Sequence, residues 1–203
     1  MKKPFAIDVD DVLGNLSDVM NPVLNRRFNK QIPVEAWSTF DISGLYGITV
    51  EQFLEVIIEE KLLEQMRPYP GVKEALRRIK TSGRDAVLVT SRGYHPTGQA
   101  LTERWLNQDD LYCDDLVIVP EGLSKAQAVV GRYPDGFEIM IDDYPPNLDK
   151  MKAAGLVDTV YLIDKPWNQD RPDFVMGRNR FRTFVDALSH HLKLEMAVDF
   201  AVA

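Results

Sequence analysis

Carboxylates gather at two places in this chain of 203 residues. One short apolar segment ends in Asp8, Asp10 and Asp11, and a later one ends in Asp142 and Asp143. Three carboxylates so close together repel one another strongly unless a cation lies among them. Hard oxygen ligands with no His beside them suit Mg²⁺ better than Zn²⁺. These acids therefore predict a magnesium site, if the fold brings the two segments together.

Groups that bind anions occur between the two acidic segments. Another apolar segment ends in Thr90, Ser91 and Arg92, and Lys125 stands at the start of a helical stretch. Hydroxyls, free backbone N–H groups and a guanidinium suit a phosphate, and the helix dipole disfavours a lysine at a helix N-terminus unless an anion holds it there. Each feature alone is better explained by a turn, a helix cap or a solvated cation. We interpret the whole set as a candidate site for a phosphate and a metal ion.

A parallel sheet would bring these groups to one edge. Short apolar runs alternate with amphipathic segments of helical length from about Gly71 onward, which predicts an α/β fold with a doubly wound parallel sheet. The carboxyl ends of such strands form the ligand crevice. The predicted strands are 5–7, 85–90, 116–119, 137–141 and 159–163. The predicted helices are 72–82, 96–107, 124–133, 147–154 and, near the end of the chain, 181–193.

Residues 14–70 interrupt the alternation. Apolar residues recur at helical spacing from Leu16 to Phe28, with Pro22 as a start or a kink, and Thr49 opens a second helix with a capping box. We predict that residues 14–70 form a helical insertion over the end of the first strand, with 1–13 and 71–203 as the core. The aromatic residues of the insertion either stack on a flat ligand or form its own small core; they are Phe28, Trp37, Phe40 and Tyr46.

Two polar groups near the C-terminus are expected to face solvent. His190 and His191 lie in the final predicted helix, and three arginines alternate before it and at its start, namely Arg178, Arg180 and Arg182. Charge runs of this kind usually form a solvated face, and a phosphate-bearing partner is the alternative for the arginines.

Length, charge and cysteine content exclude several classes of protein. A chain of 203 residues favours one domain, or one domain with an insertion. Lys and Arg number 24 against 31 Asp and Glu, and the resulting net charge of −7 argues against a general nucleic-acid binder. The single Cys113 excludes an internal disulfide framework. No apolar run approaches the roughly 20 residues of a membrane span, so we expect a soluble, cytoplasmic protein.

The motifs resemble those of the haloacid-dehalogenase-like (HAD) superfamily. Asp8-x-Asp10-x-Val12, Thr90, Lys125 and Asp142-Asp143 occur in the order and sheet positions of its four motifs, between about residues 5 and 164. The resemblance implies a Rossmann-like core with a small helical cap of the C1 type, inserted after the first strand. The second Asp of Asp-x-Asp implies the phosphatase and phosphotransferase branches.

A narrower resemblance, to the 5′(3′)-deoxyribonucleotidase family of bacteria and phages, comes from the C-terminal half. It rests on Asp-Asp-x-x-x-Asn-Leu at 142–148 and Asp-x-Pro-Trp-Asn at 164–168. Two positions depart from the family pattern: Asp11 replaces the usual Gly after the second Asp, and Pro22 interrupts the first cap helix. Neither departure removes a catalytic group, and both leave the geometry of the cap and the identity of the substrate open.

The resemblance implies a role for each site residue. Asp8 would be the nucleophile that forms an aspartyl-phosphate, and Asp10 would be the general acid and base. Mg²⁺ would be held by Asp8, by the backbone carbonyl of Asp10 and by Asp143, with Asp142 as a supporting or alternate ligand. The groups expected to hold the phosphate are Thr90, Ser91, Arg92 and Lys125.

We therefore expect a Mg²⁺-dependent phosphatase that acts on deoxynucleoside 5′-monophosphates, with the base on the cap aromatics. A polynucleotide 3′-end phosphatase and another small-molecule HAD phosphatase are the alternatives within this chemistry. A receiver-like signalling module is the alternative outside it, although it would have no Asp-x-Asp and no insertion. No stable binding to nucleic acid or membrane is expected, and the oligomeric state stays open, with a homodimer as one option.

Overall fold

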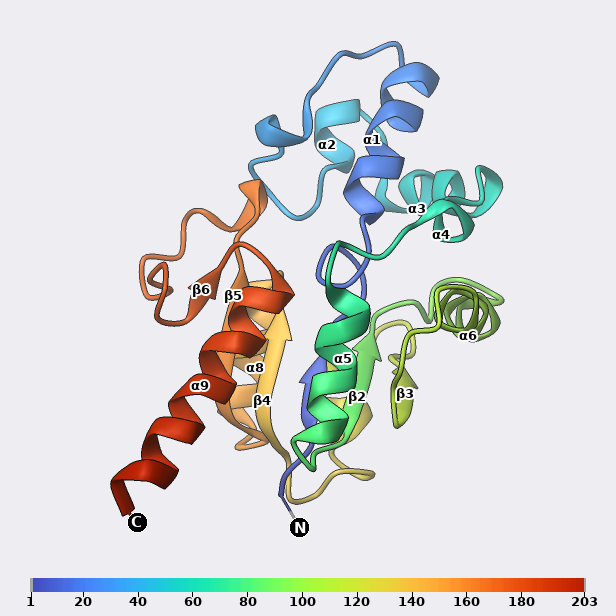
Figure 1. Ribbon diagram of the computed structural model, residues 1–203. Coiled ribbons are helices and arrows are strands. Elements are labelled where there is room, and N and C mark those ends of the chain that lie inside the picture. The colour runs from blue at the N-terminus through green and yellow to red at the C-terminus, as the bar shows by residue number, and fades with distance from the viewer. Residues whose placement is uncertain (1, 203) are drawn as a thin grey trace.

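The chain folds around a six-stranded sheet in the order β3-β2-β1-β4-β5-β6 (Figure 1), in which every pairing is parallel. The computed structural model describes residues 2–202, with side chains as far as Lys193. The strands are β1 (Phe5–Ile7), β2 (Ala86–Thr90), β3 (Asp115–Ile118), β4 (Phe137–Asp142), β5 (Val157–Ile163) and β6 (Arg180–Phe181). The predicted fold class is confirmed.

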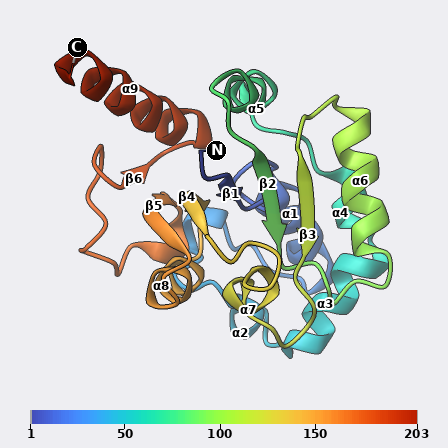
Figure 2. The ribbon, with the colours of Figure 1, turned by 90° about the horizontal axis from the view of Figure 1, so that it is seen from below.

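Helices cover both faces of the sheet. Figure 2 shows α5 (Val72–Thr81) and α9 (Phe184–Val202) on one face, with α7 (Lys125–Val129) and α8 (Pro145–Ala153) on the other. Helix α6 (Gly98–Gln108) lies beside β3 and contributes Trp105 and Leu106 to the same hydrophobic core as α5. Successive residues of a strand point to opposite faces, so β1, β2, β4 and β5 each contribute side chains to the hydrophobic cores on both faces of the sheet.

A separate group of helices stands beyond the carboxyl ends of the strands (Figure 1). It lies between β1 and α5 in the sequence. Its elements are α1 (Leu16–Arg27), the 3₁₀ turn η1 (Val34–Ala36), α2 (Ser43–Tyr46), α3 (Val50–Glu59) and α4 (Leu62–Gln65). The predicted capping box opens α3, where the Thr49 hydroxyl accepts from the N–H of Gln52. Pro22 lies inside α1 rather than at its start.

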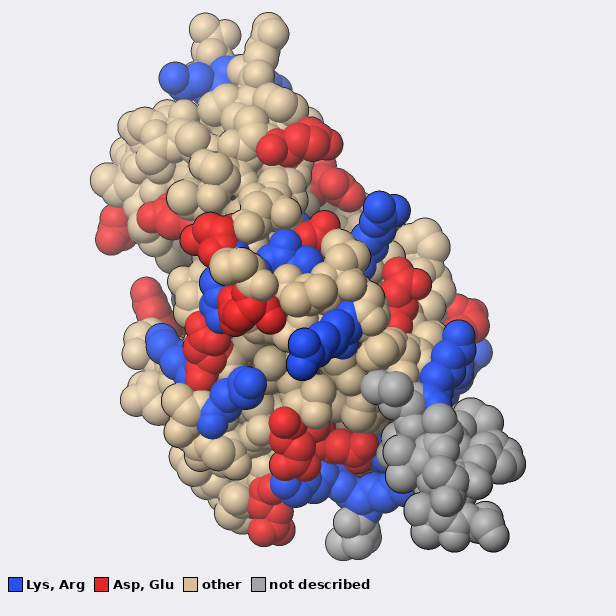
Figure 3. All heavy atoms as spheres, turned by 90° about the vertical axis from the view of Figure 1, so that its left-hand side faces the viewer, with Lys and Arg blue, Asp and Glu red and all other residues tan. Residues whose placement is uncertain are grey.

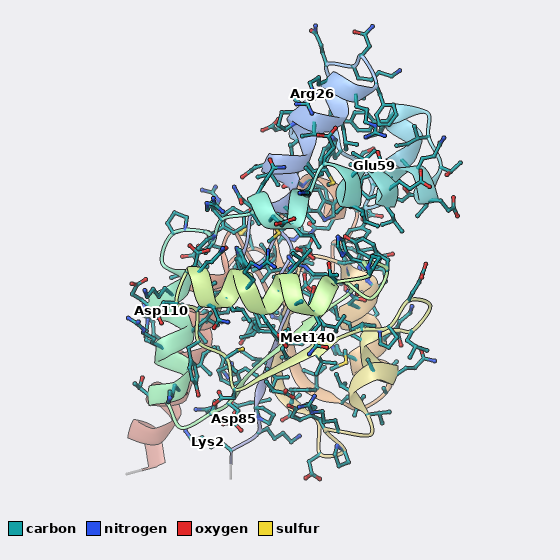
Figure 4. The ribbon with its side chains drawn as sticks, turned by 90° about the vertical axis from the view of Figure 1, so that its right-hand side faces the viewer. Lys2, Arg26, Glu59, Asp85, Asp110 and Met140 are labelled. Carbon is teal, nitrogen blue, oxygen red and sulfur yellow. The ribbon has the colours of Figure 1, made fainter. Side chains whose placement is uncertain are left out.

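The outer surface of this helical group is tied together by ion pairs. Arg26 of α1 pairs with Glu60, next to the end of α3, at 3.0 Å, and Arg27 pairs with Glu59. Figure 4 shows Arg26 and Glu59 in the helical group, at the opposite end of the molecule from Lys2. No helix among the described residues is long and apolar enough to cross a membrane.

Three expectations about the segment before the last helix are wrong. Residues 180–181 form β6, paired with Leu162 and Ile163 of β5, so the last helix begins at Phe184 and the sheet has six strands rather than five. A strand of two residues has no visible periodicity. Arg180 is not on a solvated face: it is only 6% exposed, and its guanidinium donates to the Asn168 carbonyl at 2.7 Å.

His191 is also not solvent-facing. It is 8% exposed and lies between β5 and β4, with Nδ1 at 3.1 Å from the Tyr161 hydroxyl and Nε2 at 2.9 Å from a Glu138 oxygen. Burial lowers the pKa of His191, although the bond to Glu138 works in the opposite direction. The sequence did not indicate that His191 is buried, because the exposed face of a helix cannot be identified from its sequence when both faces carry polar residues.

Candidate active site

The register of the sheet brings the two acidic segments together. Ile7 of β1 pairs with Ile141 of β4, and the N–H of Asp8 donates to the Ile141 carbonyl at 3.0 Å. Asp8 therefore leaves β1 beside the point where Asp142 ends β4 and Asp143 follows it. Each strand ends at the same edge because the pairing is parallel, which is where α/β folds form their ligand crevices.

Asp8, Asp142 and Asp143 form a buried cluster. Each offers one oxygen, and these oxygens lie within 4.8 Å of one another. Burial, reinforced by Asp142 and Asp10, raises the pKa of Asp8 to about 7, although Lys125 lowers it. Burial and the neighbouring acids also raise the pKa of Asp143 well above its usual value. Three buried carboxylates with oxygen donors only fit a hard divalent cation such as Mg²⁺.

Lys125 lies against the same cluster. It is the first residue of α7, which begins with a capping box between Ser124 and Gln127. Its Nζ donates to Asp8 and, at 2.7 Å, to Asp142. Burial alone would lower the pKa of Lys125, but the carboxylates of Asp142 and Asp8 raise it. The ammonium therefore stays charged beside the carboxylate that follows β1.

The carboxylate of Asp10 is bound by groups at the end of β2. Its two oxygens accept from Nε of Arg92 at 3.0 Å and from a terminal nitrogen of the same guanidinium. The Thr90 hydroxyl lies 3.4 Å from Asp10, and Arg92 also donates to Thr102 at 2.9 Å. Of the residues predicted to bind phosphate or to catalyse, Asp8, Asp10, Ser91 and Lys125 line the cavity at this edge. Thr90 and Arg92 contact Asp10 and are not among the lining residues.

The family-specific motif residues hold the two acids of the second segment. The Trp167 indole N–H donates to Asp143 at 2.8 Å, and the Asn168 amide donates to the Asp143 carbonyl at 2.8 Å. Asn147 donates to Asp142 at 3.1 Å. Asp142 is thus occupied by protein donors on both oxygens, since the N–H of Tyr144 binds the other one at 2.8 Å.

A cavity of about 240 Å³ separates the acids from the helical group. Its far wall is apolar, with residues from α1, α3 and the segment between them, namely Leu16, Met20, Trp37, Phe40, Ile42, Phe53, Leu54 and Ile57. This volume is below the range of about 300–1,000 Å³ that is usual for pockets of drug-sized ligands, which favours a small molecule. The opposite wall carries the acids, so the cavity has one charged wall and one apolar wall.

The four aromatic residues singled out in the insertion divide into two pairs. Trp37 and Phe40 line the cavity, and the Phe40 ring packs on Tyr144 with centroids 4.0 Å apart. Phe28 and Tyr46 are not among the lining residues; their rings lie 6.2 Å apart, and Tyr46 is buried in the hydrophobic core.

Sequence reasoning missed several residues that line the cavity. Tyr94 and Tyr144 each follow a motif residue within two positions, so proximity to a strand end was the available signal. Asn147 belongs to the quoted motif at 142–148, but no role was assigned to it from the sequence. Leu16, Met20 and Phe53 carried the spacing of helix faces, which indicates burial but not what the face covers.

Comparisons with known proteins find relatives over most of the chain. The sequence profile of the family described as "5′ nucleotidase, deoxy (Pyrimidine), cytosolic type C protein" matches residues 3–181. A Bacillus subtilis (strain 168) protein named "Putative nucleotidase YqfW" is 28% identical over 173 residues, which make up 81% of this chain and 82% of that protein.

Two solved structures share the fold. The haloacid dehalogenase-like family protein SP0104 from Streptococcus pneumoniae superposes with a TM-score of 0.62 at 14% identity, over 94% of this chain and 98% of that one. A hydrolase from Pseudomonas syringae does so with a TM-score of 0.61 at 15% identity, over 95% and 99%. Since the profile match spans most of the sequence, the chain belongs to the 5′ nucleotidase, deoxy (Pyrimidine), cytosolic type C family and is a phosphoric monoester hydrolase of the 5′-nucleotidase type.

Proposed function

We propose that this protein is a Mg²⁺-dependent phosphatase that hydrolyses deoxynucleoside 5′-monophosphates through a phosphate ester of Asp8. The observation that carries the proposal is the cavity itself. On one side it is lined by Asp8, Asp143 and Lys125, and on the other by the aromatic rings of Trp37 and Phe40. A nucleoside monophosphate needs both surfaces, because its phosphate binds charged groups and a metal ion and its base stacks on aromatic rings.

Asp8 and Asp143 are the proposed side-chain ligands of Mg²⁺, with the backbone carbonyl of Asp10. Asp143 keeps one oxygen for a metal, because Trp167 binds only its Oδ2. Asp142 is the proposed support for Lys125, since its oxygens already accept from Lys125, Asn147 and Tyr144. When bound, the ion would offset negative charge on the phosphoryl oxygens.

The residues of the chain carry the covalent chemistry. A carboxylate oxygen of Asp8 attacks phosphorus, the ester P–O bond breaks, and the leaving sugar oxygen takes a proton from Asp10. In the second half, Asp10 takes a proton from water, whose oxygen attacks phosphorus and releases Asp8 and phosphate. Lys125 keeps positive charge beside the phosphoryl group throughout, and Ser91 adds a hydroxyl at the cavity wall.

Residues 14–70 are the proposed cap, and residues 1–13 with 71–203 the proposed catalytic core. Supporting this division, α1 to α4 form a group of their own beyond the strand ends (Figure 1). The leaving group must lie between the two units, because the cavity has walls from both. The cap would therefore select the nucleoside, while the core would select the phosphate.

The proposed substrate is a small molecule rather than a nucleic acid. On the face shown in Figure 3, Lys and Arg side chains are mixed with Asp and Glu and form no basic stripe. A phosphodiester backbone attracts a protein through such a stripe. The lone Cys113 and the name of the matched family support a cytosolic location.

A panel of phosphate monoesters, assayed with and without Mg²⁺, tests this function. Deoxynucleoside 5′-monophosphates should exceed sugar phosphates in kcat/KM by about tenfold to a hundredfold, the factor expected from stacking one base. Equal rates for sugar phosphates would leave only a general phosphatase. A preference for 3′-phosphorylated oligonucleotides would favour end repair instead.

A further inference from the structure

Asp11 has an unusual backbone conformation. It follows Asp10 in the loop after β1 and has a φ of 59°, in the left-handed region that favours glycine. Asp tolerates this region better than most residues but still at a cost relative to glycine. Its side chain is also buried, with the residue only 7% exposed. A buried carboxylate on a strained backbone position needs compensating contacts.

These contacts come directly from two other segments and, through Tyr69, from a third. One Asp11 oxygen, Oδ1, accepts from the N–H of Ser17 at 3.0 Å, from the Ser17 hydroxyl at 2.6 Å and from the Tyr69 hydroxyl at 3.4 Å. Lys165 in turn donates to the Tyr69 hydroxyl at 3.1 Å. We name Asp11, Ser17, Tyr69 and Lys165 the Asp11 clasp. It joins the loop after β1, the first turn of α1, the return linker to α5 and the loop after β5.

Asp11 does for α1 what a helix-capping residue normally does. The residue before the helix, Asn15, makes no side-chain bond to it and instead accepts from the N–H of Arg67 at 2.7 Å. The first N–H groups of a helix need acceptors, and a negative charge near them is favourable. The carboxylate of Asp11 therefore caps α1 from the core side of the molecule.

The capped helix forms part of the cavity wall. Leu16 and Met20 are four residues apart on α1, so they share a face, and both line the cavity opposite the acids. We propose that Asp11 is a positioning residue that holds α1 at a set distance from Asp8. Leu16 and Met20 of α1 then contact the nucleoside when its phosphate lies beside Asp8. This inference rests on the proposed function.

Three variants test the clasp. D11G removes the carboxylate and suits the left-handed backbone, so strain cannot explain its defect. D11N keeps an oxygen that can accept both Ser17 bonds, and asparagine also tolerates this backbone region. N29G is the matched control, because Asn29 has a φ of 48° but is exposed and lies after α1, away from the clasp.

The first readout is the ratio of kcat/KM for thymidine 5′-monophosphate to kcat/KM for acetyl phosphate, whose leaving group is too small to reach the cap. We expect this ratio to fall about tenfold in D11G, mainly through KM for the nucleotide. D11N should stay within about threefold of wild type, and N29G should match it. An unchanged ratio in D11G, or an equal fall in N29G, would overturn the proposal.

The second readout needs no substrate. Amide hydrogen exchange at Ser17 should be at least about tenfold faster in D11G than in wild type, and unchanged in N29G, because the acceptor of that N–H is gone. Equal protection in wild type and D11G would refute the clasp. If wild type does not hydrolyse thymidine 5′-monophosphate, the proposed function fails, and the exchange measurement still decides whether the clasp exists.

Discussion

Arg92 is excluded from solvent and donates to both carboxylate oxygens of Asp10. A guanidinium that binds a carboxylate with two parallel donors fixes the plane of that carboxylate. Asp10 is the proposed proton donor to the leaving group, so its orientation matters for the chemistry. Arg92 was expected from the sequence to bind phosphate, and we propose instead that it acts through Asp10.

Replacing Arg92 should therefore lower kcat when Asp10 is present. When Asp10 has already been replaced, the change at Arg92 should cause no further loss of kcat. We expect R92K to reduce kcat by about 10²-fold, because a lysine cannot reproduce the paired donors. D10N should lose about 10²- to 10⁴-fold, the range for a missing general acid. The double variant D10N/R92K should be no slower than D10N alone. Losses that multiply would show that Arg92 acts on the phosphate directly.

Asp8 is the proposed nucleophile, and D8N should be folded but nearly inactive. We expect kcat to fall by roughly 10⁴-fold or more, as for other lost nucleophiles. Because burial raises the pKa of Asp8 to about 7, the neutral amide removes an unfavourable charge, and the metal-free variant should unfold at the same temperature as wild type or higher. Fluorine NMR should detect beryllofluoride on wild type and not on D8N. Near-normal turnover by D8N would reject the assignment.

Mg²⁺ should stabilise the folded chain as well as activate it. A cation among Asp8, Asp142 and Asp143 relieves their repulsion, and a ligand at a hundred times its Kd adds about 2.7 kcal/mol to the free energy of unfolding. Calorimetry with EDTA and then with Mg²⁺ measures the shift in Tm. D143N should lose most of it. Restoration of activity by Zn²⁺ with no effect of Mg²⁺ would show that the oxygen-ligand argument is wrong.

Aromatic residues of the proposed cap should affect substrate preference only where they line the cavity. W37A and F40A each remove a ring from the cavity wall, and we expect each to lower the preference for nucleotides over sugar phosphates by up to about a hundredfold. F28A is the matched control: it removes a ring of the same insertion that does not line the cavity, so the preference should hold even if Tm falls. A loss of preference in F28A equal to that in F40A would mean that cap stability, not stacking, is measured.

Acid should destabilise the protein partly through His191. Burial holds its pKa below the unfolded value of about 6.5. The unfolded chain therefore binds the proton first, and the free energy of unfolding falls as the pH drops through 6.5. The groups that face His191 are Glu138, Arg84, Tyr161 and His190. Urea unfolding between pH 7.5 and 5 should show a smaller loss for H191Q than for wild type, and parallel curves would contradict the prediction.

Much of the core could be predicted because its signals are local. The strands β2, β4 and β5 are near-continuous apolar runs, since helices cover both faces of the sheet. The capping box at Thr49 joins residues three positions apart. Motif spacing is equally local, so the sequence sufficed to identify the HAD-like fold and the nucleotidase family, both of which are confirmed.

Only the tertiary structure decided which partner each polar side chain takes. Arg92 meets Asp10, and His191 meets Glu138, across separations of 82 and 53 residues, so no local pattern indicates either pair. The strand β6 exists only because Phe181 pairs with Ile163, which two residues of sequence cannot reveal. Phe28 and Phe40 are both phenylalanines of the same insertion, and only long-range packing places Phe28 against the hydrophobic core and Phe40 at the cavity wall. Residue types and spacing thus determined which chemical groups are available at the strand ends, whereas long-range packing determined the orientation and the partner of each group.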